Sequence, residues 1–323
     1  MKIAKYIACA LMLVAAVACQ KHQIIYDTTK IADLGKTAEF QLHFFVPQTT
    51  AASQNVDSVF VNGVRYASIK GTTAVTFSAM NGIPSTAGRF YVVAPGKVNI
   101  VLWRGGEEIY NQTTTLKEGK VNIFIYDYEK EPIVLDNEYP YFNATRVLDL
   151  EHFGTDTVSS VRFINLLFEE KGKPYEGKLQ YQYRQYNTKD TIDWTIDEKT
   201  GLPVPVTEYR WVNFGKPVGF GETTGRLLVP VDQINGISAS GKLDQAAQAL
   251  YYRILVADES KPQSEWEPMM HYAASGDKVM SVYSDYWTAT VGRSTNHILC
   301  GIRTSNANTA DETYSRVVSW TSN

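Results

Sequence analysis

VDSVFVNG, residues 56–63, is the stretch that decides the fold class of this chain. An apolar run ends at Val61, and Asn62-Gly63 stands between it and the next apolar residue, Val64. Both residues of an Asn-Gly pair readily adopt positive φ, which the tight turn of a two-residue hairpin requires. The stretch therefore predicts a β-hairpin.

Strand patterns continue on both sides of this hairpin. Residues 39–44 alternate polar and apolar side chains, which is typical of a half-buried strand. Gly105-Gly106 separates two further strand patterns and predicts a second tight hairpin. About seven short strands with regular turn signals fit an immunoglobulin-type antiparallel β-sandwich over residues 37–130. This region has no pair of cysteines around a tryptophan, so we do not expect an antibody-type domain.

A second series of strand patterns follows a Pro-containing acidic segment, residues 131–145, which predicts a linker. Residues 146–323 predict a second, larger and more elaborated β-sandwich. Within it, the alanine-rich stretch Lys242–Leu250 predicts one short helix, and residues 190–206 predict either a long loop or an extended hairpin. The expected fold class is all-β, with two immunoglobulin-like antiparallel β-sandwich modules in tandem.

Residues 1–18 predict a lipoprotein signal peptide. Lys2 and Lys5 precede an apolar run, and small residues then lead to Cys19. The apolar run is about 11 residues long, whereas a membrane-spanning helix needs roughly 20. The stretch Ala16-Val17-Ala18-Cys19 resembles the lipobox of bacterial lipoproteins, apart from its first residue, where leucine is commoner. The resemblance implies cleavage before Cys19 and lipid on its sulfur, which attaches the protein to a membrane.

The alternative is an ordinary signal peptide followed by an incidental cysteine. In the lipoprotein interpretation, residues 19–36 form a polar tether, and Cys300 is the one cysteine left without lipid. The mature chain then has 29 basic and 34 acidic residues, a net charge of −5. With no basic block in the sequence, we expect no nucleic-acid partner.

Short stretches of both modules are similar to a domain family of exported Bacteroidetes lipoproteins. They are Val59–Val64, Ala94–Ile100 and Thr114–Lys120 in the first module, and Val161–Asn165 in the second. Members of this family carry tandem immunoglobulin-like domains of unknown function behind a lipid anchor. The resemblance implies a periplasmic or surface accessory protein and brings no catalytic residues with it.

The sequence contains no catalytic or cofactor signature that we recognise. The five histidines lie far apart, and no pair of cysteine or histidine residues has the spacing of a zinc site. Gly236–Gly241 does not match the Gly-x-Ser-x-Gly pattern of a nucleophilic serine, and we expect a loop there. Cys300 lies in an apolar strand pattern, where a buried small side chain is the simpler interpretation. We therefore expect no enzyme activity, cofactor or metal.

Aromatic residues are the main indication of a binding site. They gather around residues 190–206, where planar rings could stack on the faces of sugars. The simpler interpretation is that tyrosine alternates along a strand because it packs well there. The candidate ligand-binding residues are Tyr181, Tyr183, Trp194, Tyr209 and Trp211.

Three Asp-Ser/Thr tripeptides resemble the O-glycosylation sequon of exported Bacteroidetes proteins. Their candidate acceptors are Ser58, Thr157 and Thr191. Thr191 lies in the segment that we expect to be most accessible.

Two functions fit these observations. The first is a non-catalytic accessory lipoprotein that binds a glycan, a peptide or a partner protein, alongside an outer-membrane nutrient transporter. The second is a structural or adhesive surface subunit, as in fimbrial or envelope assembly. Either would be anchored in the outer membrane through Cys19, on its periplasmic face or on the cell surface.

Overall fold

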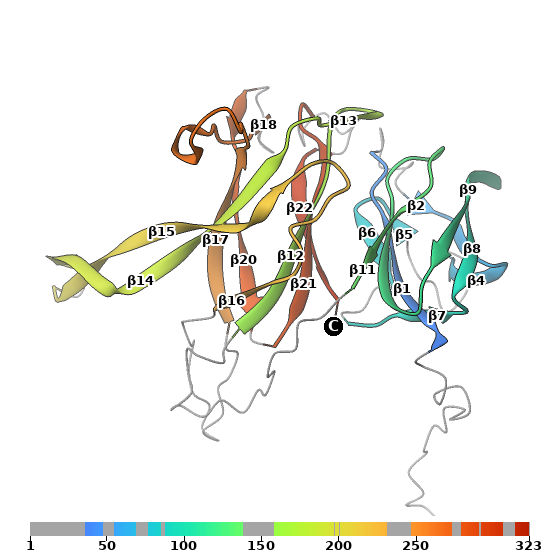
Figure 1. Cartoon of the computed structure of the whole chain (residues 1–323), viewed down its shortest axis with the longest axis horizontal. Coiled ribbons are helices and arrows are strands. Elements are labelled where there is room, and N and C mark those ends of the chain that lie inside the picture. Colours follow the sequence, from blue (N-terminus) through green and yellow to red (C-terminus); the bar gives the residue numbers. More distant parts are fainter. Residues whose placement is uncertain are drawn as a thin grey trace, which may run out of the picture.

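The computed structural model in Figure 1 is built almost entirely of β-strands. It describes residues 36–47, 55–68, 77–84, 88–137, 158–196, 198–199, 201–230, 247–272, 279–290, 292–305 and 314–322. Within these ranges the chain forms no α-helix, and a short 3-10 helix, η4, covers Gln263–Glu265. No helix among the described residues is long and apolar enough to cross a membrane. The predicted all-β fold class is confirmed.

The first module is a sandwich of two main sheets. Its inner sheet has the order β11 (Ile133–Asp136), β10 (Gly119–Ile125), β1 (Ala38–Phe44) and β6 (Asn81–Ile83), with β7 (Tyr91–Val93) also on β1. Its outer sheet has the order β4 (Val64–Ser68), β3 (Ser58–Val61), β8 (Gly96–Arg104) and β9 (Glu107–Leu116). A short pair, β2 (Asn55–Val56) and β5 (Phe77–Ser78), completes it. Apolar side chains from both main sheets, such as Phe40 and Ile100, form the core between them.

Both predicted hairpins are present in the first module. Strands β3 and β4 turn at Asn62-Gly63, where φ is 49° and 76°, and Val61 pairs with Val64. Strands β8 and β9 turn at Gly105-Gly106, where φ is 62° and 84°. These glycines are needed because residues with a Cβ rarely adopt such angles.

The second module is also a sandwich. Its inner sheet has the order β13 (Lys173–Pro174), β12 (Val158–Glu170), β21 (Ser294–Ile302) and β22 (Arg316–Thr321), with β16 (Leu227–Pro230) also on β12. Its outer sheet has the order β15 (Pro203–Val218), β14 (Leu179–Ile196), β17 (Ala247–Val256) and β20 (Ser284–Thr290). A small hairpin joins β18 (Met270–Tyr272) to β19 (Met280–Val282). The core between the sheets contains rings such as Phe163, Tyr252 and Trp287.

The sheets are not purely antiparallel, which corrects one part of the sequence prediction. β1 pairs with β10 in parallel, and β12 pairs with β21 in parallel. Each pair joins the first strand of a module to a late strand of the same module. Parallel neighbours need a long crossover connection, and here the intervening chain crosses to the other sheet before it returns.

The helix predicted over Lys242–Leu250 is wrong where the structure describes it. Residues from Ala247 onward form β17, while 242–246 lie outside the described residues. Leu250, Tyr252 and Ile254 are buried in the core, and the residues between them face outward. This period of two, together with pairing to β14 and β20, outweighs the helix propensity of the alanines.

The described residues of 190–206 belong to an extended hairpin, the second of the two predicted alternatives. β14 and β15 remain paired as far as Ile196 and Pro203. β17 pairs only with Leu179–Tyr183 of β14, so the rest of the hairpin continues as a two-stranded arm. Figure 1 shows this arm projecting from the second module.

The inner sheets of the two modules pack against each other. An apolar cluster between them contains Phe45 and Phe124 from the first module and Ile164 and Ile298 from the second. The four strands that carry these contacts, β1, β10, β12 and β21, are therefore buried on both faces. The result is a stack of four main sheets, with an outer sheet at each end (Figure 1).

The segment predicted as a linker contributes to this stack. Within 131–145, residues Ile133–Asp136 form β11 on the edge of the first inner sheet. Ile133 and Leu135 pack against the cluster between the modules. Residues 138–145 lie outside the described residues.

Candidate functional site

The predicted ligand-binding aromatics do not lie on one face. Tyr181 is 0% exposed and stacks on Phe163 with ring centroids 4.2 Å apart, so it cannot contact a ligand. Tyr183 is half-buried and packs against the same core. Trp211 is 37% exposed. The side chains of Trp194 and Tyr209 lie outside the described residues.

Strand alternation explains this division. Tyr181 pairs with Phe214 of β15, and both side chains enter the core. Trp211 pairs instead with Arg184, one register step out of phase with the core residues of both strands. The sequence prediction grouped these residues because they are close in sequence, although they lie on opposite faces of one sheet. The prediction that Tyr181 contacts a ligand is therefore wrong, and Tyr181 is a core residue.

A set of exposed aromatic and half-buried arginine residues occupies the outward face of the second module's outer sheet. We call Arg184, Trp211, Tyr251, Arg253 and Tyr286 the aromatic–arginine face. Tyr251 and Tyr286 are 46% and 59% exposed, and they pair across β17 and β20. Four neighbouring strands thus bring three accessible rings and two guanidinium groups onto one surface.

Cation–π contacts connect the members of this face. The guanidinium of Arg253 lies 4.5 Å from the centroid of the Trp211 ring, and that of Arg184 lies 4.6 Å from the Tyr251 ring. The Tyr251 and Tyr286 rings lie 5.7 Å apart. Such contacts hold rings in place at an exposed surface, where each contributes about 0.5–1 kcal/mol.

Sequence analysis missed Tyr251 and Tyr286. Tyr251 lies just after the stretch interpreted as helix, and Tyr286 is far away in sequence. The alternation of Leu250, Tyr252 and Ile254 contains the signal, because it places Tyr251 and Arg253 on the opposite face.

A groove of about 290 Å³ adjoins this face, and we call it the Arg253 groove. It is lined by Gln182, Trp211, Arg253, Leu255, Gln263, Ser264, Trp266 and Pro268. Side-chain amides at its edge bond to one another: Gln182 Nε2 donates to Asn213 Oδ1 at 2.7 Å, and Asn213 Nδ2 donates to Gln263 Oε1 at 3.0 Å. The groove therefore combines two indole rings, one guanidinium and polar groups held by the protein.

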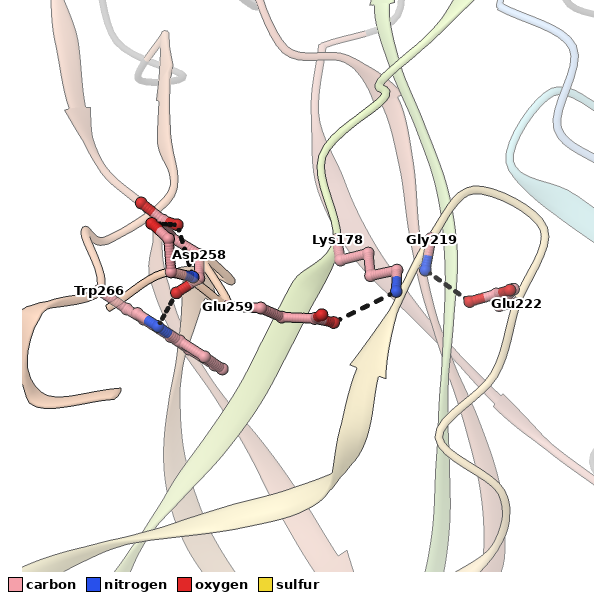
Figure 2. Close-up of polar contacts among 7 residues, drawn as sticks. Lys178, Gly219, Glu222, Asp258, Glu259 and Trp266 are labelled. Carbon is pink, nitrogen blue, oxygen red and sulfur yellow. Dashed lines mark hydrogen bonds and ion pairs between the residues drawn. The ribbon is translucent and has the colours of Figure 1, made fainter. Parts of the chain in front are cut away.

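The wall of the groove that carries Trp266 is held by several contacts, most of them drawn in Figure 2. The indole Nε1 donates to the carbonyl oxygen of Asp258 at 2.7 Å. The Asp258 carboxylate accepts hydrogen bonds from Ser260 and lies 3.2 Å from Lys261 Nζ. Lys178, which precedes β14, lies 3.4 Å from Glu259 through its Nζ. The Trp266 indole is thus oriented by hydrogen bonds to its own loop.

A second groove, of about 600 Å³, lies on the outward face of the first module's outer sheet. Its apolar lining includes Phe60, Val101 and Trp103, and its charged residues include Arg65 and Glu108. We call it the Trp103 groove. It is larger than the Arg253 groove, but its lining carries charges of both signs.

One candidate O-glycosylation residue is described, and it lies at the Trp103 groove. Ser58 begins β3, is half-buried and lines the groove. The neighbouring Asp57 carboxylate accepts a hydrogen bond from the Gly105 amide at 2.6 Å. The side chains of Thr157 and Thr191 lie outside the described residues. Modification at all three positions remains a prediction.

Residues with nucleophilic or metal-binding chemistry are buried or dispersed in the described part of the chain. Burial raises the pKa of the Cys300 thiol to about 12, and its side chain packs between the modules, as predicted for a small core residue. Burial lowers the pKa of His297 to about 3 in the core of the second module. The described ranges contain no group of three or more His, Cys, Asp or Glu residues that could hold a metal ion. Residues 236–241 and Cys19 lie outside those ranges.

Compared with known proteins, this chain matches no protein-family model and no curated protein sequence.

Proposed function

We propose that this protein is a non-catalytic binding protein whose ligand is a glycan that docks on the aromatic–arginine face. The observation that carries the proposal is the set of three exposed rings, on β15, β17 and β20 of one sheet, beside a groove lined with amides. Removing a flat aromatic ring from water costs little free energy, and the ring can stack against the apolar face of a sugar. Amide groups that alternate as donors and acceptors can bond to sugar hydroxyls.

The rest of the chain supports an exported, membrane-anchored role for this binding. We infer from the signal-peptide pattern that lipid on Cys19 holds the protein at the outer membrane, on the periplasmic face or the cell surface. A glycan receptor in that position would deliver or present its ligand to an outer-membrane nutrient transporter. A tether over residues 19–36 would leave the two modules room to reach it.

A glycan array tests the proposed function directly. Fluorescently labelled full-length protein, purified in detergent, is compared with Trp211→Ala and with Trp103→Ala as the matched control from the other groove. We expect wild type and Trp103→Ala to bind the same glycans, and Trp211→Ala to bind them more weakly. An array without signal for wild type contradicts the proposal and favours a protein partner, because Tyr, Trp and Arg also predominate in protein interfaces.

The second candidate function, a structural or adhesive subunit, is favoured by the projecting arm of β14 and β15. Two-stranded hairpins are marginally stable in water, so a long arm suits contact with another chain. Sedimentation velocity of wild type and of a variant with residues 190–206 replaced by Asn-Gly distinguishes the two. Concentration-dependent assembly that disappears with the shortened arm supports the subunit function.

A further inference from the structure

Among the described residues, Arg253 has no acidic partner, although its surroundings partly exclude water. Its Nε donates to Gln182 Oε1 at 2.9 Å, and its guanidinium lies over the Trp211 ring. The described residues form no ion pair with it. Burial lowers the pKa of Arg253, as expected for a cation that is desolvated without a nearby anion.

Arg303 in the same module shows the usual arrangement for comparison. It is also half-buried and lies near an aromatic ring, that of Tyr175, at 5.7 Å. It forms a bidentate pair with Glu169, in which Nε donates to Oε2 at 2.6 Å and Nη2 donates to Oε1. Bidentate pairing of this kind is what an arginine in a partly buried site normally requires.

No carboxylate of the described part of the chain pairs with Arg253 in this way. The Arg253 groove is lined by neutral residues apart from Arg253 itself. The Asp285 carboxylate accepts hydrogen bonds from the hydroxyls of Tyr252 and Tyr283, and Glu259 pairs with Lys178. Glu265 and Glu267, on the loop that carries Trp266, line a different pocket together with Lys261 and Arg303. Arg184 adds a second positive charge on the same face.

The two Nη groups of Arg253 are therefore available to a ligand. No described residue accepts a hydrogen bond from them, and they are not among the buried polar atoms that lack a partner. Arg253 lines the groove together with Trp211 and Trp266. A planar guanidinium in this position can donate to two oxygens of a carboxylate or a sulfate group, while the indoles stack on the sugar ring that bears this group.

We propose that the glycan bound at the Arg253 groove is acidic, and that Arg253 binds its anionic group while Trp211 and Trp266 hold the sugar ring. This inference rests on the proposed function, because it names the class of glycan for the same face. Uronic acids and sulfated sugars share the required oxyanion.

The test measures binding of acidic oligosaccharides by isothermal titration calorimetry with full-length protein in detergent. The probes are oligogalacturonate, oligomannuronate, hyaluronan and chondroitin sulfate oligosaccharides. Each uronic-acid probe is paired with its carboxyl-reduced form, which keeps the ring but loses the charge. The variants are Arg253→Gln, Arg253→Lys and, as a matched control from the Trp103 groove, Arg65→Gln.

We expect wild type to bind at least one acidic probe. Arg253→Gln should bind that probe with about 10- to 100-fold lower affinity, which is the effect of losing one charge-assisted contact. Arg253→Lys should bind with intermediate affinity, since it keeps the charge but not the bidentate geometry, and Arg65→Gln should bind like wild type. Affinity for the reduced form should be low and unchanged by Arg253→Gln. Unchanged thermal midpoints confirm that the variants fold.

Three outcomes overturn the inference. Equal binding of a uronate and its reduced form shows that charge is not recognised, and leaves the proposed function standing. Binding of acidic probes that Arg253→Gln leaves intact places the anion elsewhere. Failure of every probe, together with an empty glycan array, removes the proposed function as well. Binding restricted to chondroitin sulfate and lost with its desulfated form supports the inference and identifies sulfate as the oxyanion.

Discussion

Tyr181 is a core residue and not part of the binding face. Its ring lies in the core of the second module, and its hydroxyl has no hydrogen-bond partner among the described residues. A buried hydroxyl without a partner costs about 1–3 kcal/mol, so we expect Tyr181→Phe to leave the free energy of unfolding unchanged or to raise it by up to about 2 kcal/mol. Urea unfolding measures this, and glycan affinity should not change. A loss of affinity in Tyr181→Phe would return this residue to the binding site.

His43 makes a second prediction at the residue scale. It is buried between the modules, its Nε2 lies 3.0 Å from Asn122 Oδ1, and it stacks on Phe124. Burial, the largest effect, and the positive charge of Arg162 lower its pKa from 6.5 to about 4, although the bond to Asn122 opposes them. Between these values the unfolded chain binds a proton that the folded chain does not.

Stability should therefore fall as the pH falls from 6.5 to 4, and it should be unaffected by His43 above pH 6.5. The contribution at pH 4 is up to about 3 kcal/mol, because one pKa unit corresponds to 1.36 kcal/mol. His297 has a similarly lowered pKa and adds to the same slope. Urea unfolding across this range should give a shallower pH dependence in His43→Gln, whose amide can still bond to Asn122. Identical slopes in wild type and His43→Gln would contradict the assignment.

At the scale of the element, Gly215 shapes β15. The register between β14 and β15 shifts here, since Leu179 pairs with Val218 and Tyr181 with Phe214. Gly215 has φ +66°, and a Cβ at this position would lie 2.8 Å from the Thr224 carbonyl oxygen. The bulge therefore requires glycine both for its backbone angle and for its close approach to the neighbouring chain.

Gly215→Ala should lower the free energy of unfolding by about 1–3 kcal/mol or more, because the alanine would be strained at this backbone angle and its Cβ would clash with Thr224. Gly201→Ala is the matched control, because Gly201 has the same φ of +66° but open space around it. It should cost about 1 kcal/mol through strain alone. Chemical denaturation compares the two, and equal losses would mean that the contact with Thr224 adds nothing.

At the scale of the whole molecule, a network of buried polar side chains accompanies the apolar cluster in the interface between the modules. Ser322 at the end of the chain donates through its hydroxyl to Gln41 Oε1 at 2.9 Å and accepts from Asn137 Nδ2 at 2.8 Å. Asn296 Nδ2 donates to Asn122 Oδ1 at 3.1 Å, which links the two inner sheets directly. Because these groups are buried, separating the modules would expose the apolar cluster and break the hydrogen-bond network at the same time.

We therefore expect calorimetry to show one cooperative unfolding transition for both modules. Asn122→Ala should lower the free energy of unfolding by about 1–3 kcal/mol, because it leaves buried partners unsatisfied. Asn99→Ala is the control, since Asn99 also forms side-chain hydrogen bonds but lies on the first outer sheet, and it should cost less. Two separate transitions in wild type would show that the modules unfold independently.

The membrane anchor is the other prediction at this scale. Lipid with more than one acyl chain attaches a protein almost permanently, at about 0.8 kcal/mol per buried methylene. Expressed in a host that processes bacterial lipoproteins, Cys19→Ala should move from the membrane fraction to the soluble fraction. Immunoblotting of the fractions measures this. Retention of the variant in washed membranes would indicate an ordinary signal or another mode of attachment.

Local patterns predicted much of the fold. The Asn62-Gly63 and Gly105-Gly106 turns depend on the backbone freedom of a few residues, which is a property of the sequence itself. The all-β class follows from many such signals, because hairpins and strand periods are short-range features. The position of Cys300 in a buried strand was predictable for the same reason.

Which face a strand presents, and to which neighbour, depended on the tertiary structure. Tyr181 and Trp211 looked equivalent in sequence, yet pairing of β14 with β15 sends one into the core and the other to the surface. Tyr251 and Tyr286 meet only because β17 and β20 are neighbours, and no local signal predicts pairing across such a distance. The inner sheets likewise bury both faces because a second module covers them. A strand pattern specifies two faces, and only the packing of distant segments decides which of them meets solvent, core or ligand.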